Sequence, residues 1–311
     1  MTSAELDPAS VTVRVPAKVN LELRVGRPRP DGYHSLATVY QAVSLYDEVT
    51  VEYAEEWGIR VIGPTAVGVP ADGTNLAARA AMLLAREGGI DEPVHLTIRK
   101  EIPVAGGMAG GSADAAAALV ACDSLWGLGL TREELEETAG ELGSDVPFLI
   151  SGGTAMGSGR GEMLAPVLAR GTFHWVFALS PNGLSTAEIY AACDRLRATE
   201  DVPEPRTSNR LMAALRSGDA HALASSLGND LQLAATTIRP ELQGILEAGI
   251  GFGALAGIVS GSGPTVAFLV DSAEGAIDLA VSLTASGTAP EVRRATGPVH
   301  GATVIAAPHA D

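Results

Sequence analysis

The sequence predicts an α+β protein with two domains. At 311 residues the chain is longer than a usual single domain, and typical domain sizes favour two. Strand patterns and helix patterns occur in groups rather than in strict alternation, which is typical of α+β folds. Glycines recur from Gly152 to Pro166 and a buried strand pattern begins at Trp175, so we expect a boundary near residue 170, between domains 1–170 and 171–311.

The first elements are strands. Apolar and polar residues alternate from Val11 to Val25, which predicts a long half-buried strand or a strand pair. Proline and Asp-Gly residues between Gly26 and His34 predict a loop, and the apolar sequence resumes from Val39 to Val51. Thr74 or Asn75 can cap a helix that runs to about Glu87, and a strand pattern follows from Val94 to Ile98.

The later elements alternate between helices and short strands. Ser112 is expected to open a helix, and Thr131 with Glu134 forms a capping-box pattern for another helix ending at Gly143. The remaining elements are expected to be a strand at Trp175–Ser180, helices at Thr186–Arg197, Asn209–Arg216 and His221–Leu227, and two strands within Leu255–Val270.

The composition limits the class of partner. Asp and Glu outnumber Lys and Arg by 37 to 21, which argues against a nucleic-acid-binding surface but is compatible with local phosphate binding by backbone N–H groups. Cys122 and Cys193 lie far apart without a CxxC pattern, so we expect buried thiols rather than a disulfide or a zinc site. The N-terminus is not a signal peptide and no apolar segment has membrane-spanning length, so we expect a soluble, cytoplasmic protein.

A glycine-rich loop, Gly106 to Ser112, separates a predicted strand from a predicted helix. The unpaired N–H groups and the dipole of the helix favour an anion there, with a di- or triphosphate as the natural occupant. A Walker A loop is excluded because Ser112 occupies the place of its lysine, and the nearest match to GxGxxG, Gly157–Glu162, ends in Glu. A flexible connector is the alternative, but the strand-to-helix context favours phosphate binding.

Two charged residues are candidates for phosphoryl transfer. Lys18, beside Asn20 on the polar face of the first strand, can supply the cation that the glycine loop lacks, although periodicity alone favours a solvated lysine. Asp145 can act as a general base, although its spacing slightly favours a helix-capping or turn role. A kinase needs both a carboxylate near the acceptor hydroxyl and a cation near the phosphoryl group.

Two further segments have functional and structural interpretations of different weight. Tyr33 and His34 lie in a glycine-bearing loop, where an aromatic ring can stack on a base and polar groups can read its edge. Packing within the turn is an equally good interpretation. The segment Ser260–Pro264, between two apolar strands, is by its own sequence an ordinary tight turn.

Three segments in order, Pro16–Asn20, Pro103–Asp114 and Ser260–Pro264, resemble the three motifs of the GHMP small-molecule kinases. The resemblance covers nearly the whole chain. The stretches PAKVNLEL, RPDGYHSLATVYQAVSLYD, LGSDVPF and GGTAMGSGRGE are similar to the branch that acts on a cytidine-diphosphate-linked sugar alcohol. The resemblance implies an N-terminal ribosomal protein S5 domain 2-like domain and a C-terminal ferredoxin-like domain, with ATP and the acceptor in the cleft between them.

The implied reaction is transfer of the ATP γ-phosphoryl group to the 2-hydroxyl of cytidine-diphosphate-linked methylerythritol, in the non-mevalonate isoprenoid pathway. Mg²⁺ is expected to accompany the nucleotide, with no ligands assigned. One rival is a GHMP kinase for homoserine or mevalonate, which would lack a cytosine pocket such as the DGYH loop implies. A second rival is a non-catalytic nucleotide-binding module, which would need neither Lys18 nor Asp145.

The resemblance also implies residue roles. Asp145 takes the proton of the acceptor hydroxyl, Lys18 stabilises the transferring phosphoryl group and keeps Asp145 ionised, and Asn20 orients the acceptor. The ATP-binding residues are expected to be Asn75 and Leu76 near the adenine, and Pro103, Val104, Ala105, Gly106, Gly107, Met108, Ala109, Gly110, Gly111, Ser112 and Ala113 around the phosphates.

The acceptor is expected to meet a second set of residues. Tyr33 and His34 stack on the cytosine and read its edge, and Tyr190 faces the opposite side of the base. Gly261 and Gly263 belong to a second glycine turn that closes on the site. Asp114 is an acid where related loops often have a small neutral residue, so its role is open between a contact with magnesium and an interaction with the helix dipole.

Overall fold

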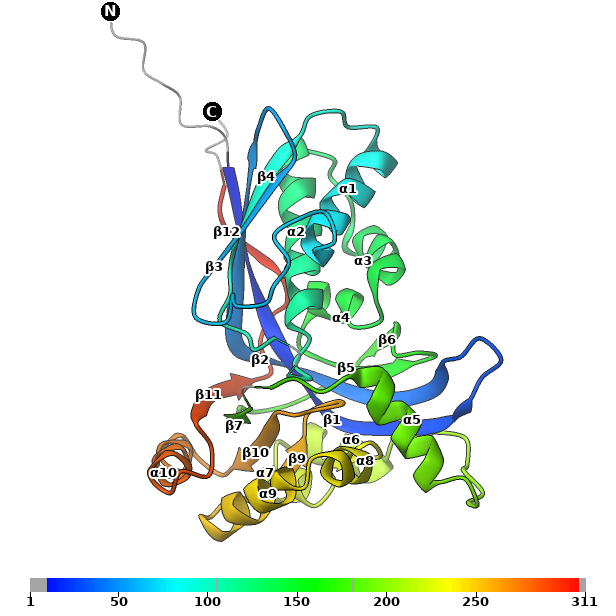
Figure 1. Cartoon of the computed structure of the whole chain (residues 1–311), viewed down its shortest axis with the longest axis vertical. Coiled ribbons are helices and arrows are strands. Elements are labelled where there is room, and N and C mark those ends of the chain that lie inside the picture. Colours follow the sequence, from blue (N-terminus) through cyan, green and yellow to red (C-terminus); the bar gives the residue numbers. More distant parts are fainter. Residues whose placement is uncertain (1–9, 105, 181, 308–311) are drawn as a thin grey trace, which may run out of the picture.

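The computed structural model describes residues 10–104, 106–180 and 182–307 and contains two β-sheets with helices on them (Figure 1). Ala105, expected at the phosphates, lies outside the described residues. The first sheet has the strand order β12-β1-β2-β4-β3, with β5 and β8 as further neighbours of β2 and β1. Its strands are β1 (Ser10–Pro28), β2 (His34–Tyr53), β3 (Gly58–Ile62), β4 (Val94–Arg99), β5 (Thr154–Ser158), β6 (Met163–Pro166), β8 (Gly228–Asn229) and β12 (Thr303–Ala306).

Strands β1 and β2 form a long antiparallel hairpin, which extends from the first sheet towards the elements around the second sheet (Figure 1). The apolar positions of β1 are buried as the alternation predicts, for example Val13 and Val19. The polar positions Lys18, Asn20 and Glu22 are buried as well, so the expectation of a half-buried strand is wrong for the middle of β1. Elements distant in the sequence cover this second face, and periodicity contains no information about them.

Four helices cover one face of the first sheet: α1 (Leu76–Gly88), α2 (Gly110–Trp126), α3 (Arg132–Leu142) and α4 (Val146–Ser151). Asn75 caps α1 by accepting a hydrogen bond from the Ala77 N–H. The expected capping box of Thr131 and Glu134 is present at the start of α3. Alanine side chains line much of α2, and this central helix packs against α1 and the sheet.

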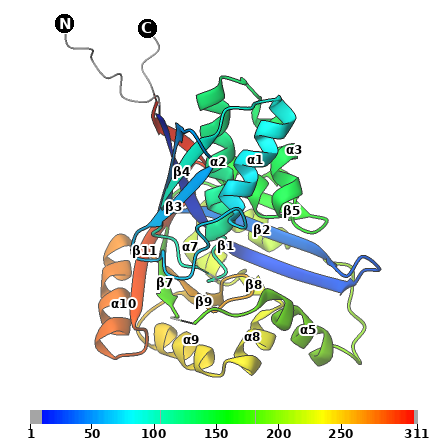
Figure 2. The same cartoon turned by 45° about the horizontal axis from the view of Figure 1, so that its top comes forward.

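The second sheet consists of β7 (Phe173–Leu179), β9 (Ala256–Val259), β10 (Val266–Val270) and β11 (Glu291–Gly297). Its order is β11-β7-β10-β9 with antiparallel neighbours, which is the expected ferredoxin-like arrangement. Helices α5 (Thr186–Leu196), α6 (Asn209–Ser217), α7 (Ala220–Ala224), α8 (Gln232–Ile238) and α9 (Glu241–Gly251) separate β7 from β9, and α10 (Ala273–Ala285) separates β10 from β11. Figure 2 shows α5, α8, α9 and α10 at the opposite end of the molecule from α1 and α3.

The chain returns to the first sheet at its C-terminal end, because β12 pairs antiparallel with β1 at Thr12 and Ala306. Apart from β8 and β12, the strands of the first sheet end at β6, and the second sheet begins at Phe173. The division at residue 170 stays a prediction. Cys122 and Cys193 are buried free thiols, as expected. No helix among residues 10–104, 106–180 and 182–307 combines the length and apolar character required to cross a bilayer.

Candidate functional site

The three motifs meet through hydrogen bonds between backbone and side-chain groups. In β1, the Lys18 N–H donates to the carbonyl oxygen of Met108 over 3.2 Å. From the second glycine turn, the Ser260 hydroxyl donates to the carbonyl oxygen of Gly107 over 3.0 Å. The glycine loop therefore lies between the first strand and the turn that connects β9 to β10.

Packing explains three of the four loop glycines. Gly107 has φ +76°, and a Cβ there would collide with the carbonyl oxygen of Ser260. A Cβ on Gly106 would lie 2.8 Å from the Thr265 hydroxyl oxygen, and one on Gly110 would lie 3.2 Å from Lys100 Nζ. Only at Gly111 does a Cβ meet no described atom within 4 Å. The bare backbone thus allows the turn to approach the loop, and Gly111 alone borders open space.

Helix α2 begins two residues earlier than expected, at Gly110 rather than at Ser112. Its N-cap residue, Ala109, has the left-handed φ of 62° and provides no side-chain cap for the first N–H groups. These N–H groups and the positive end of the helix dipole lie where the glycine loop enters α2. An anion is the ligand that such a helix start favours.

Lys18 is part of a buried hydrogen-bonded row. Its Nζ donates to Asn20 Oδ1 over 2.7 Å and lies 3.5 Å from Asp145 Oδ2. Asn20 Nδ2 donates in turn to the Thr38 hydroxyl over 2.8 Å. Lys18 and Asn20 are only 4% and 3% exposed, so the solvated-lysine interpretation is wrong. Thr38 was missed because a threonine within a strand has no sequence signal.

Asp145 stands at the N-cap position of α4, but its side chain makes no capping hydrogen bond. Its carboxylate lies towards Lys18 instead, so the capping interpretation is wrong for the side chain. Burial and then the neighbouring Asp145 carboxylate raise the pKa of Tyr40 well above its usual value. Lys18 Nζ also lies 5.7 Å from the centre of the Tyr40 ring. Tyr40 was missed because apolar neighbours in β2 identify it only as core.

The aromatic residues at the hairpin end lie in two groups. His34 Nε2 is 2.9 Å from Asp194 Oδ1, and the His34 ring lies 4.9 Å from the Tyr190 ring at 40°. Tyr33 is 55% exposed, with the Arg160 guanidinium 5.1 Å from the centre of its ring. The structure therefore brings His34 and Tyr190 together, while Tyr33 remains accessible on the loop. Sequence reasoning singled out neither Asp194 nor Arg160.

The turn Ser260–Pro264 is more than an ordinary turn. A Cβ on Gly261 would lie 3.4 Å from both Lys18 Nζ and Asn20 Oδ1, so this glycine borders the charged row. Asn229 Nδ2 holds the turn by donating to the carbonyl oxygens of Val259 and Gly261, over 2.8 and 2.7 Å. Gly263 has φ +80° and packs against Val259, which indicates a structural requirement at that position.

The two residues expected near the adenine lie at the start of α1. Asn75 is 5% exposed as a residue, and its side chain donates to the carbonyl oxygen of Pro70 and caps α1, so both ends of its amide have protein partners. Leu76 is half-buried, and Val104 is 43% exposed beside the loop. The role of Asn75 and Leu76 at the adenine stays a prediction.

A buried ion triad supports the loop from below. Lys100 Nζ donates to Asp47 Oδ2 and, over 2.8 Å, to Asp114 Oδ2. Asp47 Oδ1 accepts the Ile102 N–H over 2.9 Å, which ties the triad to the start of the loop. Burial acts to lower the pKa of Lys100, but the two carboxylates outweigh it and raise that pKa. Burial raises the pKa of Asp114, with Lys100 opposing this effect and Asp47 adding to it.

Comparisons with known proteins agree with this geometry. The models for the GHMP kinases N terminal domain and the GHMP kinases C terminal match residues 75–153 and 211–288. The chain is 57% identical to 4-diphosphocytidyl-2-C-methyl-D-erythritol kinase of Streptomyces avermitilis, over 95% of this chain and 100% of that protein. It is 58% identical to the kinase of that name from Thermobifida fusca, over 96% of this chain and 99% of that protein.

Two solved structures have the same fold as this chain. A crystal structure of 4-(cytidine 5'-diphospho)-2C-methyl-D-erythritol kinase, 31% identical, superposes with a TM-score of 0.75 over 91% of this chain and 98% of that one. A homoserine kinase from Cytophaga hutchinsonii, 17% identical, shares the fold with a TM-score of 0.68 over 98% of this chain and 99% of that one. By its sequence and its fold, this chain belongs to the 4-diphosphocytidyl-2-C-methyl-D-erythritol kinases, a branch of the GHMP kinases.

Proposed function

We propose that the protein transfers the γ-phosphoryl group of ATP to the 2-hydroxyl of 4-diphosphocytidyl-2-C-methyl-D-erythritol, giving the 2-phosphate and ADP in the non-mevalonate isoprenoid pathway. The observation that carries this proposal is the position of the Lys18–Asp145 pair beside the glycine loop and the second glycine turn. A phosphate-binding helix start and an acid–ammonium pair are the two components that phosphoryl transfer to an alcohol requires. The high identity to kinases of that name supports this acceptor.

The proton transfer is assigned to Asp145. Its carboxylate accepts the proton of the acceptor hydroxyl while the hydroxyl oxygen attacks the γ-phosphorus and the bond to the ADP oxygen breaks. The Lys18 ammonium, 3.5 Å from the carboxylate, attracts the charge that develops on the transferring group. Asn20 accepts a hydrogen bond from Lys18 Nζ, which orients the ammonium.

The triphosphate is assigned to the N-terminal end of α2. The side chain of Ala109 offers no cap, so the first N–H groups of the helix are available to phosphate oxygens. Gly111 leaves space over these groups because no described atom lies within 4 Å of its missing Cβ. The phosphates can therefore approach the backbone more closely at Gly111 than at a residue with a side chain.

Magnesium would neutralise part of the phosphate charge when it binds with ATP. Among residues 10–104, 106–180 and 182–307, no group of three or more His, Cys, Asp or Glu side chains is arranged to hold a metal ion. This arrangement fits an ion held mainly by phosphate oxygens and water. Asp114 fits a ligand role poorly, because its Oδ2 accepts from Lys100 and the residue is only 2% exposed.

The cytosine is assigned to the hairpin end and α5. Tyr33 has an exposed ring that can cover one face of a base, and Tyr190 packs beside His34 across from the hairpin loop. Aromatic faces stack on any base, so these rings provide affinity, and the polar atoms of His34 provide recognition of the base edge. The homoserine and mevalonate kinases of this fold act on acceptors that have no base.

The test is an ADP-release assay in which the purified protein is offered the cytidine-linked acceptor, homoserine and mevalonate in parallel. We expect turnover with the cytidine-linked acceptor alone, and product analysis should place the new phosphate on its 2-hydroxyl. Turnover with homoserine or mevalonate instead would assign the protein to another branch. Tight ATP binding without turnover on any of the three would favour a non-catalytic module.

A further inference from the structure

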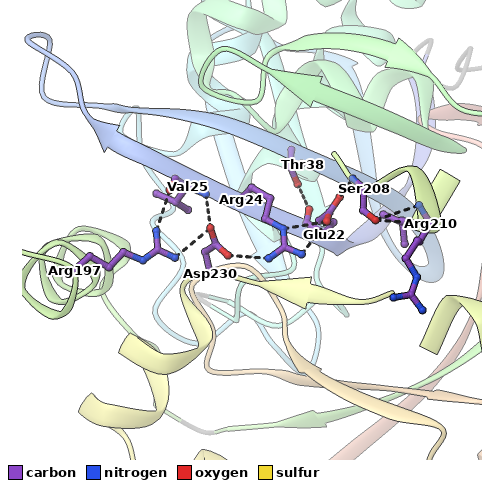
Figure 3. Close-up of polar contacts among 9 residues, drawn as sticks. Glu22, Arg24, Val25, Thr38, Arg197, Ser208, Arg210 and Asp230 are labelled. Carbon is purple, nitrogen blue, oxygen red and sulfur yellow. Dashed lines mark hydrogen bonds and ion pairs between the residues drawn. The ribbon is translucent and has the colours of Figure 1, made fainter. Parts of the chain in front are cut away.

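We propose that four charged residues, Glu22, Arg24, Asp230 and Arg197, form a positioning network that holds the base-binding helix α5 in place relative to the Lys18–Asp145 pair. We call this set the β1–α5 ion network, and Figure 3 shows its contacts. The inference rests on the proposed function, because its role is to align the two ends of the acceptor.

The network begins on β1, the strand that carries Lys18. Glu22 and Arg24 continue the alternate positions of β1 that start with Lys18 and Asn20. Hydrogen bonds connect these positions, since Asn20 donates to the Thr38 hydroxyl and that hydroxyl donates to the Glu22 carbonyl oxygen over 2.7 Å. A displacement of β1 near Glu22 would therefore be transmitted to Asn20 and Lys18.

Glu22 is fully buried, and three donors satisfy its carboxylate. Arg24 Nε and Nη2 each lie 3.0 Å from Oε1, and the Ser208 N–H donates to Oε2 over 2.8 Å. A buried carboxylate without such partners would cost several kcal/mol, so Glu22 holds Arg24 and the start of α6 in one arrangement.

Asp230 is the centre of the network. Its Oδ1 accepts from Arg24 Nη1 over 3.1 Å, and its Oδ2 accepts the Val25 N–H over 3.0 Å. Arg197, the C-cap residue of α5, lies with Nη2 3.1 Å from the same Oδ2 and donates from Nη1 to the Val25 carbonyl oxygen over 2.9 Å. One carboxylate thus ties the end of α5 to β1 (Figure 3).

Both ends of the proposed acceptor site depend on this junction. Helix α5 carries Tyr190 and Asp194, so its position sets the wall that contacts His34. Asn229, the residue before Asp230, holds the Gly261 turn against Lys18 and Asn20. The adjacent pair Asn229–Asp230 therefore connects helix α5, which carries the proposed base-binding residue Tyr190, to the glycine turn beside Lys18.

The composition of the network indicates positioning rather than ligand binding. Two acids and two arginines balance in charge, and each carboxylate has at least two donors. Apolar side chains of similar volume can stabilise a fold as well as buried ion pairs do, but they lack the directional contacts of a guanidinium. Fixed direction is the property that two separated halves of a binding site require.

The test compares wild type with Asp230→Asn, measuring kcat and the KM for ATP and for the cytidine-linked acceptor separately. We expect the acceptor KM to rise about tenfold, which is the effect of about 1.4 kcal/mol, while the ATP KM stays within about twofold. Glu48→Gln is the matched control, since it breaks an exposed ion pair with Arg14 at the other end of the same hairpin. It should change neither KM.

A second variant covers the case in which Asp230→Asn does not fold. Arg197→Lys keeps the charge but cannot donate both to Asp230 and to the Val25 carbonyl oxygen from a planar fork, so we expect a smaller rise in acceptor KM. If both single variants fold, the double variant should raise the acceptor KM by less than the product of the single effects.

The outcomes separate the two proposals. Suppose that the wild-type enzyme turns over the acceptor. Equal rises in both KM values, or kinetics unchanged in both Asp230→Asn and Arg197→Lys, would then overturn the network and leave the proposed function standing. Absence of wild-type turnover would overturn the proposed function, and the network with it. A selective rise in acceptor KM supports both.

Discussion

Lys18 Nζ lies 3.5 Å from Asp145 Oδ2, which joins the middle of β1 to the N-terminal end of α4. Lys18 is almost entirely buried, whereas the Asp145 side chain is 27% exposed. The ammonium is therefore fixed by the protein, while the carboxylate has access to a ligand. This asymmetry suits a base that contacts an incoming acceptor and a cation that stays in place.

Asp145→Asn should reduce turnover strongly without weakening ATP binding, because the carboxylate acts on the acceptor. General-base catalysis contributes about 10²–10⁴-fold, so we expect kcat to fall within that range. ADP release and an ATP titration measure the two effects. Glu141→Gln, at an exposed acid on α3, is the control and should behave as wild type. Full activity of Asp145→Asn would refute the base assignment.

Gly107→Ala should destabilise the protein and weaken ATP binding together. The substitution requires alanine at φ +76° and places its Cβ against the Ser260 carbonyl oxygen, so the loop and the turn must separate. We expect a loss of about 1–3 kcal/mol in the free energy of unfolding, measured by urea denaturation. Gly140→Ala in α3, where no described atom is within 4 Å, should instead gain up to about 1 kcal/mol.

Gly111→Ala should separate ligand binding from stability. Its Cβ meets no described atom within 4 Å and the residue is helical, so the thermal midpoint should stay equal or rise slightly. The same Cβ would occupy space that we assign to the triphosphate, and we expect ATP affinity to fall at least about tenfold. Unchanged ATP affinity would place the phosphates elsewhere.

Tyr33→Ala and Tyr190→Ala should each weaken acceptor binding and leave ATP binding unchanged. Stacking of a base on an aromatic ring is worth about 1–3 kcal/mol, which sets the expected loss. Tyr190→Phe is the control, because it keeps the ring that packs against His34. Titration with the acceptor in the absence of ATP measures these affinities. An acceptor affinity equal to that of wild type in both alanine variants would exclude stacking of the base between Tyr33 and Tyr190.

Asp114→Asn should make the stability of the protein less dependent on pH. Burial raises the pKa of Asp114 in the folded state, so between the ordinary carboxyl pKa and this raised pKa the folded chain holds a proton that the unfolded chain releases. Wild-type stability should therefore fall as pH rises from the ordinary carboxyl value through this raised pKa. Urea denaturation over a pH series tests this, with the exposed Asp91→Asn as a control that should retain the wild-type slope. Identical slopes for wild type and Asp114→Asn would contradict the prediction.

Local sequence features predicted much of the secondary structure. The cap at Thr131 and the C-terminal Gly143 were identified correctly, and Asn75 was one of the two residues expected to cap α1, because capping depends on residues within one helical turn. The start of α2 was placed two residues late, since the left-handed Ala109 that begins it is an unusual conformation for a residue with a side chain. Strand β12 was not predicted, because its pairing with β1 joins opposite ends of the chain.

The sequence by itself determined the alternation of apolar and polar residues along β1, the glycine loop before α2 and the family motifs that contain Lys18 and Asp145. The tertiary structure alone decided that Lys18 is buried, that the Asp145 carboxylate turns away from its helix, and that Asp230 connects α5 to β1. Periodicity and capping report on neighbours within a few residues of one another. Burial and ion pairing depend on segments that the chain brings together only when it folds.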